Sequence, residues 1–128
     1  WPWVEILTSH AGARAQTITH WIKANVDGLV LAGSGIGGFH DVWRTPLDEA
    51  SSKGIALVRS SRTGSGLTFQ DIPEKDGVGC LAAGSLAAPK ARIALQLAIY
   101  AAKQANLTGK PLTWQDFFAR IADLPEIR

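Results

Sequence analysis

The sequence predicts an α/β fold, a three-layer αβα domain in which helices cover both faces of a small four-stranded parallel sheet. Short apolar runs of strand length alternate with longer segments of helical periodicity. Glycine-rich or polar segments follow these runs, where turns between strands and helices belong. The 128 residues are 46% hydrophobic and 19% charged, so one domain of this length can bury a core without disulfides or metal ions.

Three strands and two helices are predicted in the first half of the chain. Residues 3–7 are rich in β-branched side chains, and residues 29–32 and 55–58 are unbroken apolar runs. Such runs suit strands that are buried on both faces of a parallel sheet. Helical periodicity predicts helices over residues 13–25 and 46–53.

The ends of these two helices carry local signals. Asp27-Gly28 is expected to stop the first helix, because glycine tolerates the backbone conformation that follows a helix. The second helix is expected to begin after Thr45 as its N-cap, with Pro46 at its first position. Gly54 is expected to end it.

The second half of the chain predicts one weaker strand and two helices. The strand is expected at residues 78–83, after a polar and turn-rich segment. Residues 89–105 predict the longest helix, whose core-facing stripe is expected at Ile93, Leu97 and Tyr100, with Ala94, Ala98 and Ala101 allowing close packing. Thr113 and Asp116 have the spacing of a capping box at the start of the last helix. The alternation of strands and helices makes the expected sheet Rossmann-like.

Composition argues against several classes of protein. The apolar runs are far shorter than a membrane span, so no membrane partner is expected. A net charge of +2 with scattered basic residues does not predict nucleic-acid binding. The single Cys80 cannot form an internal disulfide, and His10, His20 and His40 lie on three different segments. We therefore expect neither a metal ion nor another cofactor.

A glycine-rich segment, 33–38, follows the second strand and fits the pattern G-x-G-x-x-G of dinucleotide sites. Arg59 and Arg62, after the third strand, could then bind a 2′-phosphate, which makes an NADP-binding module one alternative. One observation argues against this alternative. In a dinucleotide site the last glycine of the pattern lies in the next helix, whereas here that helix is predicted to start several residues later, at Thr45. We favour Arg59, Ser60 and Arg62 as structural residues of a polar loop.

Four segments of the chain resemble one family of enzymes. They are Val4–Leu7, Asp27–Gly35, Gly54–Arg62 and Ala88–Arg92. In order and spacing they are similar to the smaller C-terminal domain of the bacterial-type L-asparaginase/glutaminase family. The similarity covers nearly the whole chain, and Val-Arg-Ser-Ser-Arg and Pro-Lys-Ala-Arg are its more specific parts.

The resemblance implies a site that is shared between subunits. In this family the nucleophilic threonine and a Thr-Asp-Lys group belong to the N-terminal domain, so no catalytic residue is expected in this chain. The C-terminal domain lends an Asn from the glycine-rich loop and a Glu from a later segment. Here these positions correspond to Gly38 and Pro73, with Glu74 one residue later. Glu74, Gly37, Gly38 and His40 are therefore the candidate substrate-binding residues.

The resemblance also implies partners. The chain has no Met, so we expect it to be a piece of a longer polypeptide that includes a catalytic N-terminal domain. Homodimers or tetramers and a small amino-acid amide substrate are implied, and the chain alone is expected to be inactive. Several tryptophans are expected to face the missing domain or another subunit: Trp1, Trp3, Trp43 and Trp114. A regulatory or interaction domain without chemistry remains an alternative.

Overall fold

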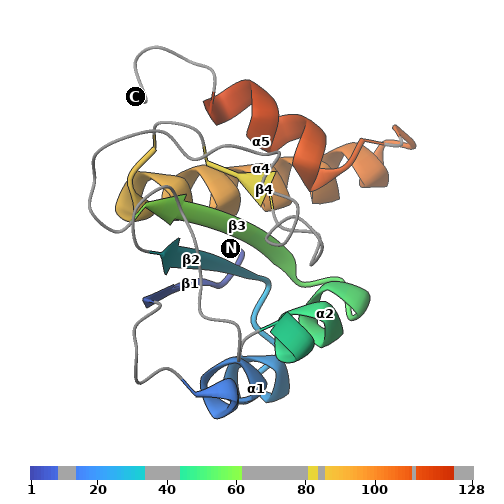
Figure 1. The fold of residues 1–128 in the computed structure, drawn as a ribbon. Coiled ribbons are helices and arrows are strands. Elements are labelled where there is room, and N and C mark those ends of the chain that lie inside the picture. Colours follow the sequence, from blue (N-terminus) through green and yellow to red (C-terminus); the bar gives the residue numbers. More distant parts are fainter. Residues whose placement is uncertain (9–13, 34–43, 62–80, 84–85, 111, 123–128) are drawn as a thin grey trace.

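The computed structural model describes residues 1–8, 14–33, 44–61, 81–83, 86–110 and 112–122 (Figure 1). Its elements, in chain order, are β1 (Val4–Thr8), α1 (Ala15–Lys23), β2 (Gly28–Gly33), α2 (Arg44–Ser52), β3 (Ala56–Ser61), β4 (Leu81–Ala82), α4 (Ala88–Leu107) and α5 (Trp114–Ala122). The order of these elements is the predicted one: strands and helices alternate up to β3, and β4 is followed by two helices.

One parallel sheet of four strands forms the middle layer, in the order β1-β2-β3-β4. Three strands have five or six residues, and β4 has only two. In Figure 1, α4 and α5 lie on one side of the sheet, and α1 and α2 lie on the other. The predicted three-layer αβα architecture is confirmed.

Side chains of β2 alternate between two separate cores, which explains its unbroken apolar run. Leu29 and Leu31 pack with α1 and α2, in a cluster that includes Ile18 and Leu47. Val30 packs on the opposite face, in the cluster that contains buried residues of α4 and α5. Successive residues of a strand point to opposite faces, so both faces of this strand need apolar side chains.

The turn from α1 into β2 differs from the prediction. The residue with positive φ is Asn25, at 61°, and asparagine is the non-glycine residue that most readily adopts this conformation. Gly28 is instead the first residue of β2. A Cβ at Gly28 would lie 3.0 Å from Leu95 Cδ2 and 3.1 Å from Ile99 Cδ1, so this glycine allows α4 to pack closely on the sheet.

The start of α2 was also predicted wrongly, whereas its end was predicted correctly. The helix begins at Arg44, so Thr45 lies inside it and is not its N-cap. Local capping preferences define a helix start only to within one or two residues. Gly54, with φ of +85°, follows the helix as expected.

The predicted core-facing side of α4 is wrong for its large residues, whereas Ala94 and Ala98 are buried as predicted. Ile93, Leu97 and Tyr100 are exposed, by 54%, 37% and 42%. The residues that face the core are mostly alanines: Ala91, Ala94, Leu95, Ala98, Ile99 and Ala102. Apolar residues occur almost all round this helix, so periodicity alone does not define one face. The sheet is contacted by the face whose small side chains permit a close approach.

The predicted capping box of α5 is confirmed. The Thr113 backbone N–H donates a hydrogen bond to Asp116 Oδ2 (3.1 Å), and the Asp116 backbone N–H donates one to Thr113 Oγ1 (3.3 Å). Two backbone donors at the helix start thereby acquire acceptors. Phe118 then buries α5 against the core that contains α4.

The same hydrogen bonds make the contribution of Asp116 to stability depend on pH. The Thr113 backbone N–H, followed by the Thr113 hydroxyl, holds the pKa of Asp116 below its ordinary value of 3.8. A carboxylate with a lowered pKa stabilises the folded state above the unfolded pKa, and this contribution disappears as the pH falls through the folded pKa.

Relative to Asp116→Asn, we expect the parent to have a higher melting temperature at neutral pH. Circular dichroism melts should show this difference shrinking below pH 3.8, and a constant difference would contradict the assignment.

Candidate functional site

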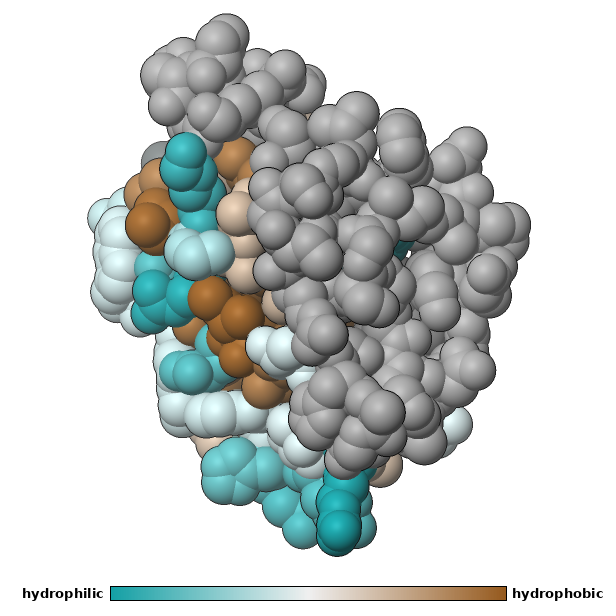
Figure 2. Space-filling view, turned by 60° about the vertical axis from the view of Figure 1, so that its left-hand side comes forward, coloured by the Kyte–Doolittle hydropathy of each residue, from teal (hydrophilic) through white to brown (hydrophobic). Residues whose placement is uncertain are grey.

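The carboxyl ends of three strands meet at one edge of the sheet. The parallel register pairs Thr8 of β1 with Ala32 of β2, and Gly33 of β2 with Ser61 of β3. Ligands of open parallel sheets bind in crevices outside this edge. Figure 2 brings this side forward, and hydrophobic residues of the described part are visible at the surface beside the grey segments.

The candidate substrate-binding residues lie outside the described residues. Gly37, Gly38 and His40 belong to the segment that follows Gly33, and Glu74 belongs to the segment that follows Ser61. Because β2 and β3 are parallel neighbours, both segments begin at the same edge. Their starting points are adjacent, and their residues stay candidates.

Two of the expected loop residues lie in a strand instead. Arg59 and Ser60 belong to β3, where they pair with Leu31 and Ala32 of β2, and both are fully buried. On the other side of β3, the Ala83 backbone N–H donates a hydrogen bond to the Arg59 carbonyl (2.9 Å). Pairing on both sides extends the strand past its apolar run and overrides the polar composition. Arg62, the third residue of this group, lies outside the described residues.

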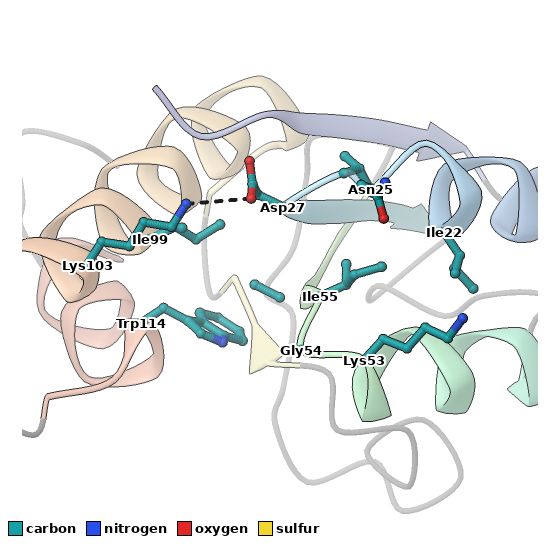
Figure 3. A pocket seen from close by; sticks show the side chains of 11 residues that line it. Ile22, Asn25, Asp27, Lys53, Gly54, Ile55, Ile99, Lys103 and Trp114 are labelled. Carbon is teal, nitrogen blue, oxygen red and sulfur yellow. Dashed lines mark ion pairs between the residues drawn. The ribbon is translucent and has the colours of Figure 1, made fainter. Parts of the chain in front are cut away.

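A pocket of about 280 Å³ opens at the opposite, amino edge of the sheet (Figure 3). Its apolar lining includes Ile55 and Trp114, and its polar rim includes Asp27 and Lys103, which form an ion pair at 3.6 Å. Asp27 Oδ2 also accepts a hydrogen bond from the Trp3 backbone N–H (2.8 Å). No sequence signal indicated this cluster, because its members come from elements far apart along the chain.

Comparison with known proteins identifies the family. Residues 3–108 match the family described as the glutaminase/asparaginase C-terminal domain. This chain belongs to that family. The resemblance based on the four sequence segments is thereby confirmed.

Curated relatives of this asparaginase-family domain carry the same family name. L-asparaginase 2 of Bacillus subtilis (strain 168) is 39% identical over 100 residues, which cover 77% of this chain and 26% of the relative. L-asparaginase 2 of Escherichia coli (strain K12) is 38% identical over 99 residues, which cover 77% of this chain and 28% of the relative. The matched region thus spans about a quarter of the length of these relatives.

A solved structure has the same fold. The crystal structure of the probable cytoplasmic L-asparaginase from Campylobacter jejuni superimposes with a TM-score of 0.73 at 29% identity. The match covers 92% of this chain and 37% of that one. It includes nearly all of the asparaginase-family domain, so the domain has the architecture of one part of a larger protein.

Two observations argue against the NADP-binding alternative for this asparaginase-family domain. Dinucleotides bind where the strand order of a sheet reverses, and the described strands follow one another without reversal. Arg59, one of the two proposed phosphate ligands, is fully buried.

The described part of the domain shows no metal centre and no membrane-spanning helix. It has no group of three or more His, Cys, Asp or Glu side chains arranged to hold a metal ion. None of its helices is long and apolar enough to cross a membrane. His20 is exposed on α1, where its ring packs edge-on against Trp21 with centroids 5.0 Å apart.

Proposed function

We propose that this chain is the C-terminal domain of an L-asparaginase-type amidohydrolase. The complete protein hydrolyses asparagine, or a similar amino-acid amide, to the acid and ammonia. The observation that carries this proposal is the match of residues 3–108 to the glutaminase/asparaginase C-terminal domain, shared with relatives named L-asparaginase. The αβα architecture shared with a probable L-asparaginase supports it.

Catalysis and substrate recognition are divided between domains in this proposal. The nucleophile belongs to an N-terminal domain outside these 128 residues. This domain completes the active site of a neighbouring subunit, within a homodimer or tetramer. The parallel pairing of β2 and β3 supports this role. The glycine-rich segment and the segment that contains Glu74 begin next to each other, at the carboxyl ends of these two strands.

Each candidate residue has a physical role in such a site. The substrate is a zwitterion, and its ammonium group needs a carboxylate, for which Glu74 is the nearest match to the family position. A hydrogen bond to a charged group contributes about 1.5–3 kcal/mol. Gly37 and Gly38 allow the substrate to approach the backbone closely, because they have no side chain. His40, two residues after Gly38, is the fourth candidate for contact with the substrate.

Ammonia release from asparagine, glutamine and related amides tests the proposal. The complete protein is expected to release ammonia, whereas the 128-residue chain alone is expected to release none above a mock preparation. Turnover by the isolated chain, abolished by a substitution within it, would contradict the assignment of the catalytic residues to the N-terminal domain. A complete protein that hydrolyses no amino-acid amide would overturn the proposed function itself.

A further inference from the structure

Most of the exposed large hydrophobic side chains in the described structure lie on α4 or next to it. Ile93, Leu97, Tyr100 and Leu107 belong to α4, and Trp1 packs on Tyr100. Trp3 instead packs against Trp21 of α1. Trp1 and Leu107 are the most exposed, at 78% and 80%. A soluble domain rarely exposes such a group without a partner, because contiguous apolar surface marks a contact site.

Helix geometry places four of these residues on one side of α4. With about 3.6 residues per turn, Ile93, Leu97, Tyr100 and Leu107 lie within a sector roughly 80° wide. The buried Ala91, Leu95, Ala98 and Ala102 lie on the opposite side. The helix therefore has two apolar faces, one in contact with the sheet and one directed away from it.

The N-terminal segment is held against α4 and widens the outer face. Gln96 Nε2 donates a hydrogen bond to the Pro2 carbonyl (3.0 Å), and Arg92 Nε donates one to the Val4 carbonyl (2.8 Å). The rings of Trp1 and Tyr100 then lie 5.2 Å apart. We call the surface made by Trp1, Ile93, Leu97 and Tyr100 the α4 face.

Most charges around the α4 face are basic. Lys90 and Lys103 are exposed on either side of it, and Lys110 is exposed beyond the end of the helix. Lys103 also forms an ion pair with Asp27 at 3.6 Å, whereas no acidic partner is found for Lys90 or Lys110 among the described residues. No Asp or Glu occurs in α4, from Ala88 to Leu107. A second copy of α4 would bring lysines near lysines, whereas a partner with carboxylates around an apolar centre would be attracted.

The size of the α4 face also distinguishes between partners. Its exposed fractions, applied to side chains of about 150–250 Å², amount to roughly 300–500 Å². A stable complex of separate proteins buries about 800 Å² on each partner. A domain on the same polypeptide needs less, because the covalent link supplies a high effective concentration.

We propose that the α4 face binds the N-terminal domain of the same polypeptide, through an apolar patch surrounded by carboxylates. This inference rests on the proposed function, in which such a domain belongs to the complete protein. The curated relatives extend well beyond the matched region, which is 26–28% of their length, so they have ample chain to form this partner.

Zero-length carbodiimide crosslinking of the complete protein tests the proposal. Subunits labelled with ¹⁴N and ¹⁵N are mixed, and crosslinked peptides are identified by mass spectrometry. We expect Lys90, Lys103 or Lys110 to join Asp or Glu residues of the N-terminal domain, with both peptides carrying the same isotope. Crosslinks from these three lysines that join the two isotopes, or no crosslink from them to that domain, would overturn the proposal.

Leu97→Glu provides the matched variant, with Thr17→Glu, exposed on the other side of the sheet, as its control. Leu97→Glu should reduce the yield of these crosslinks at least tenfold and increase proteolytic cleavage between the domains, whereas Thr17→Glu should change neither. Equal crosslinking in both variants would overturn the proposal. The ammonia assay separates this proposal from the proposed function. Crosslinks in a complete protein without amidase activity would refute the proposed function but not the domain contact. Amidase activity without these crosslinks would refute the domain contact alone.

Discussion

Replacing Arg59 by alanine is expected to lower the free energy of unfolding by about 3–5 kcal/mol, the range for truncation of large buried side chains. Arg59 is the largest fully buried side chain among the described residues, and it lies on β3 between β2 and β4. Truncation would leave a cavity in the middle layer, where packed neighbours relax only partly. Urea unfolding followed by circular dichroism measures the loss as a lower midpoint at an unchanged slope.

Two further substitutions test the cause of this loss. Arg120→Ala, exposed on α5, should change the free energy of unfolding by no more than about 0.5 kcal/mol. Arg59→Met retains much of the volume without the guanidinium and should be less destabilising than Arg59→Ala. If Arg59→Ala lowers the free energy of unfolding no more than Arg120→Ala does, burial of the Arg59 side chain does not stabilise the sheet.

In the complete protein, Glu74→Gln is expected to lower kcat/KM for the amino-acid amide about ten- to a hundredfold. The glutamine side chain would keep a hydrogen-bond acceptor for the substrate ammonium group but would lose the negative charge. Hydrogen bonds to charged groups contribute about 1.5–3 kcal/mol. Steady-state kinetics on asparagine and glutamine measure the effect. Size-exclusion chromatography must show that the oligomer is unchanged.

Asp76→Asn is the matched control for this prediction, because it neutralises a carboxylate two residues away in the sequence. Its kcat/KM should remain within about twofold of the parent, since the family position lies next to Glu74. A Glu74→Gln variant that also stays within twofold would show that Glu74 does not bind the substrate. A large effect of Asp76→Asn alone would indicate that Asp76, and not Glu74, binds the substrate ammonium group.

Features that depend on neighbouring residues were predictable from the sequence. The strands are short apolar runs, and the parallel arrangement of the first three follows because helices separate them. The capping box of Thr113 and Asp116 involves groups only three residues apart, so its hydrogen bonds form as the spacing predicts. Gly54 ends α2 because its positive φ is a local property of the backbone.

Features that depend on distant residues were not predictable in the same way. Arg59 and Ser60 belong to a strand because β2 and the segment around Ala83 pair with them on both sides. The apolar pattern of α4 permits two orientations, and the outer one, with Ile93 and Leu97, has the larger side chains. Large apolar residues were therefore expected in the core, although the buried face consists mostly of alanines. Its two larger residues, Leu95 and Ile99, fit closely against Gly28, which has no side chain.

The sequence by itself determined the layer architecture, the order of the elements and the family, because periodicity, turn residues and motifs are local and survive without a partner. Only the tertiary structure decided which face of α4 is buried, how far β3 extends and where Asp27 finds its partners in Trp3 and Lys103. These outcomes depend on contacts between residues far apart in the chain. Packing density, strand pairing and charge proximity arise only when the elements are brought together.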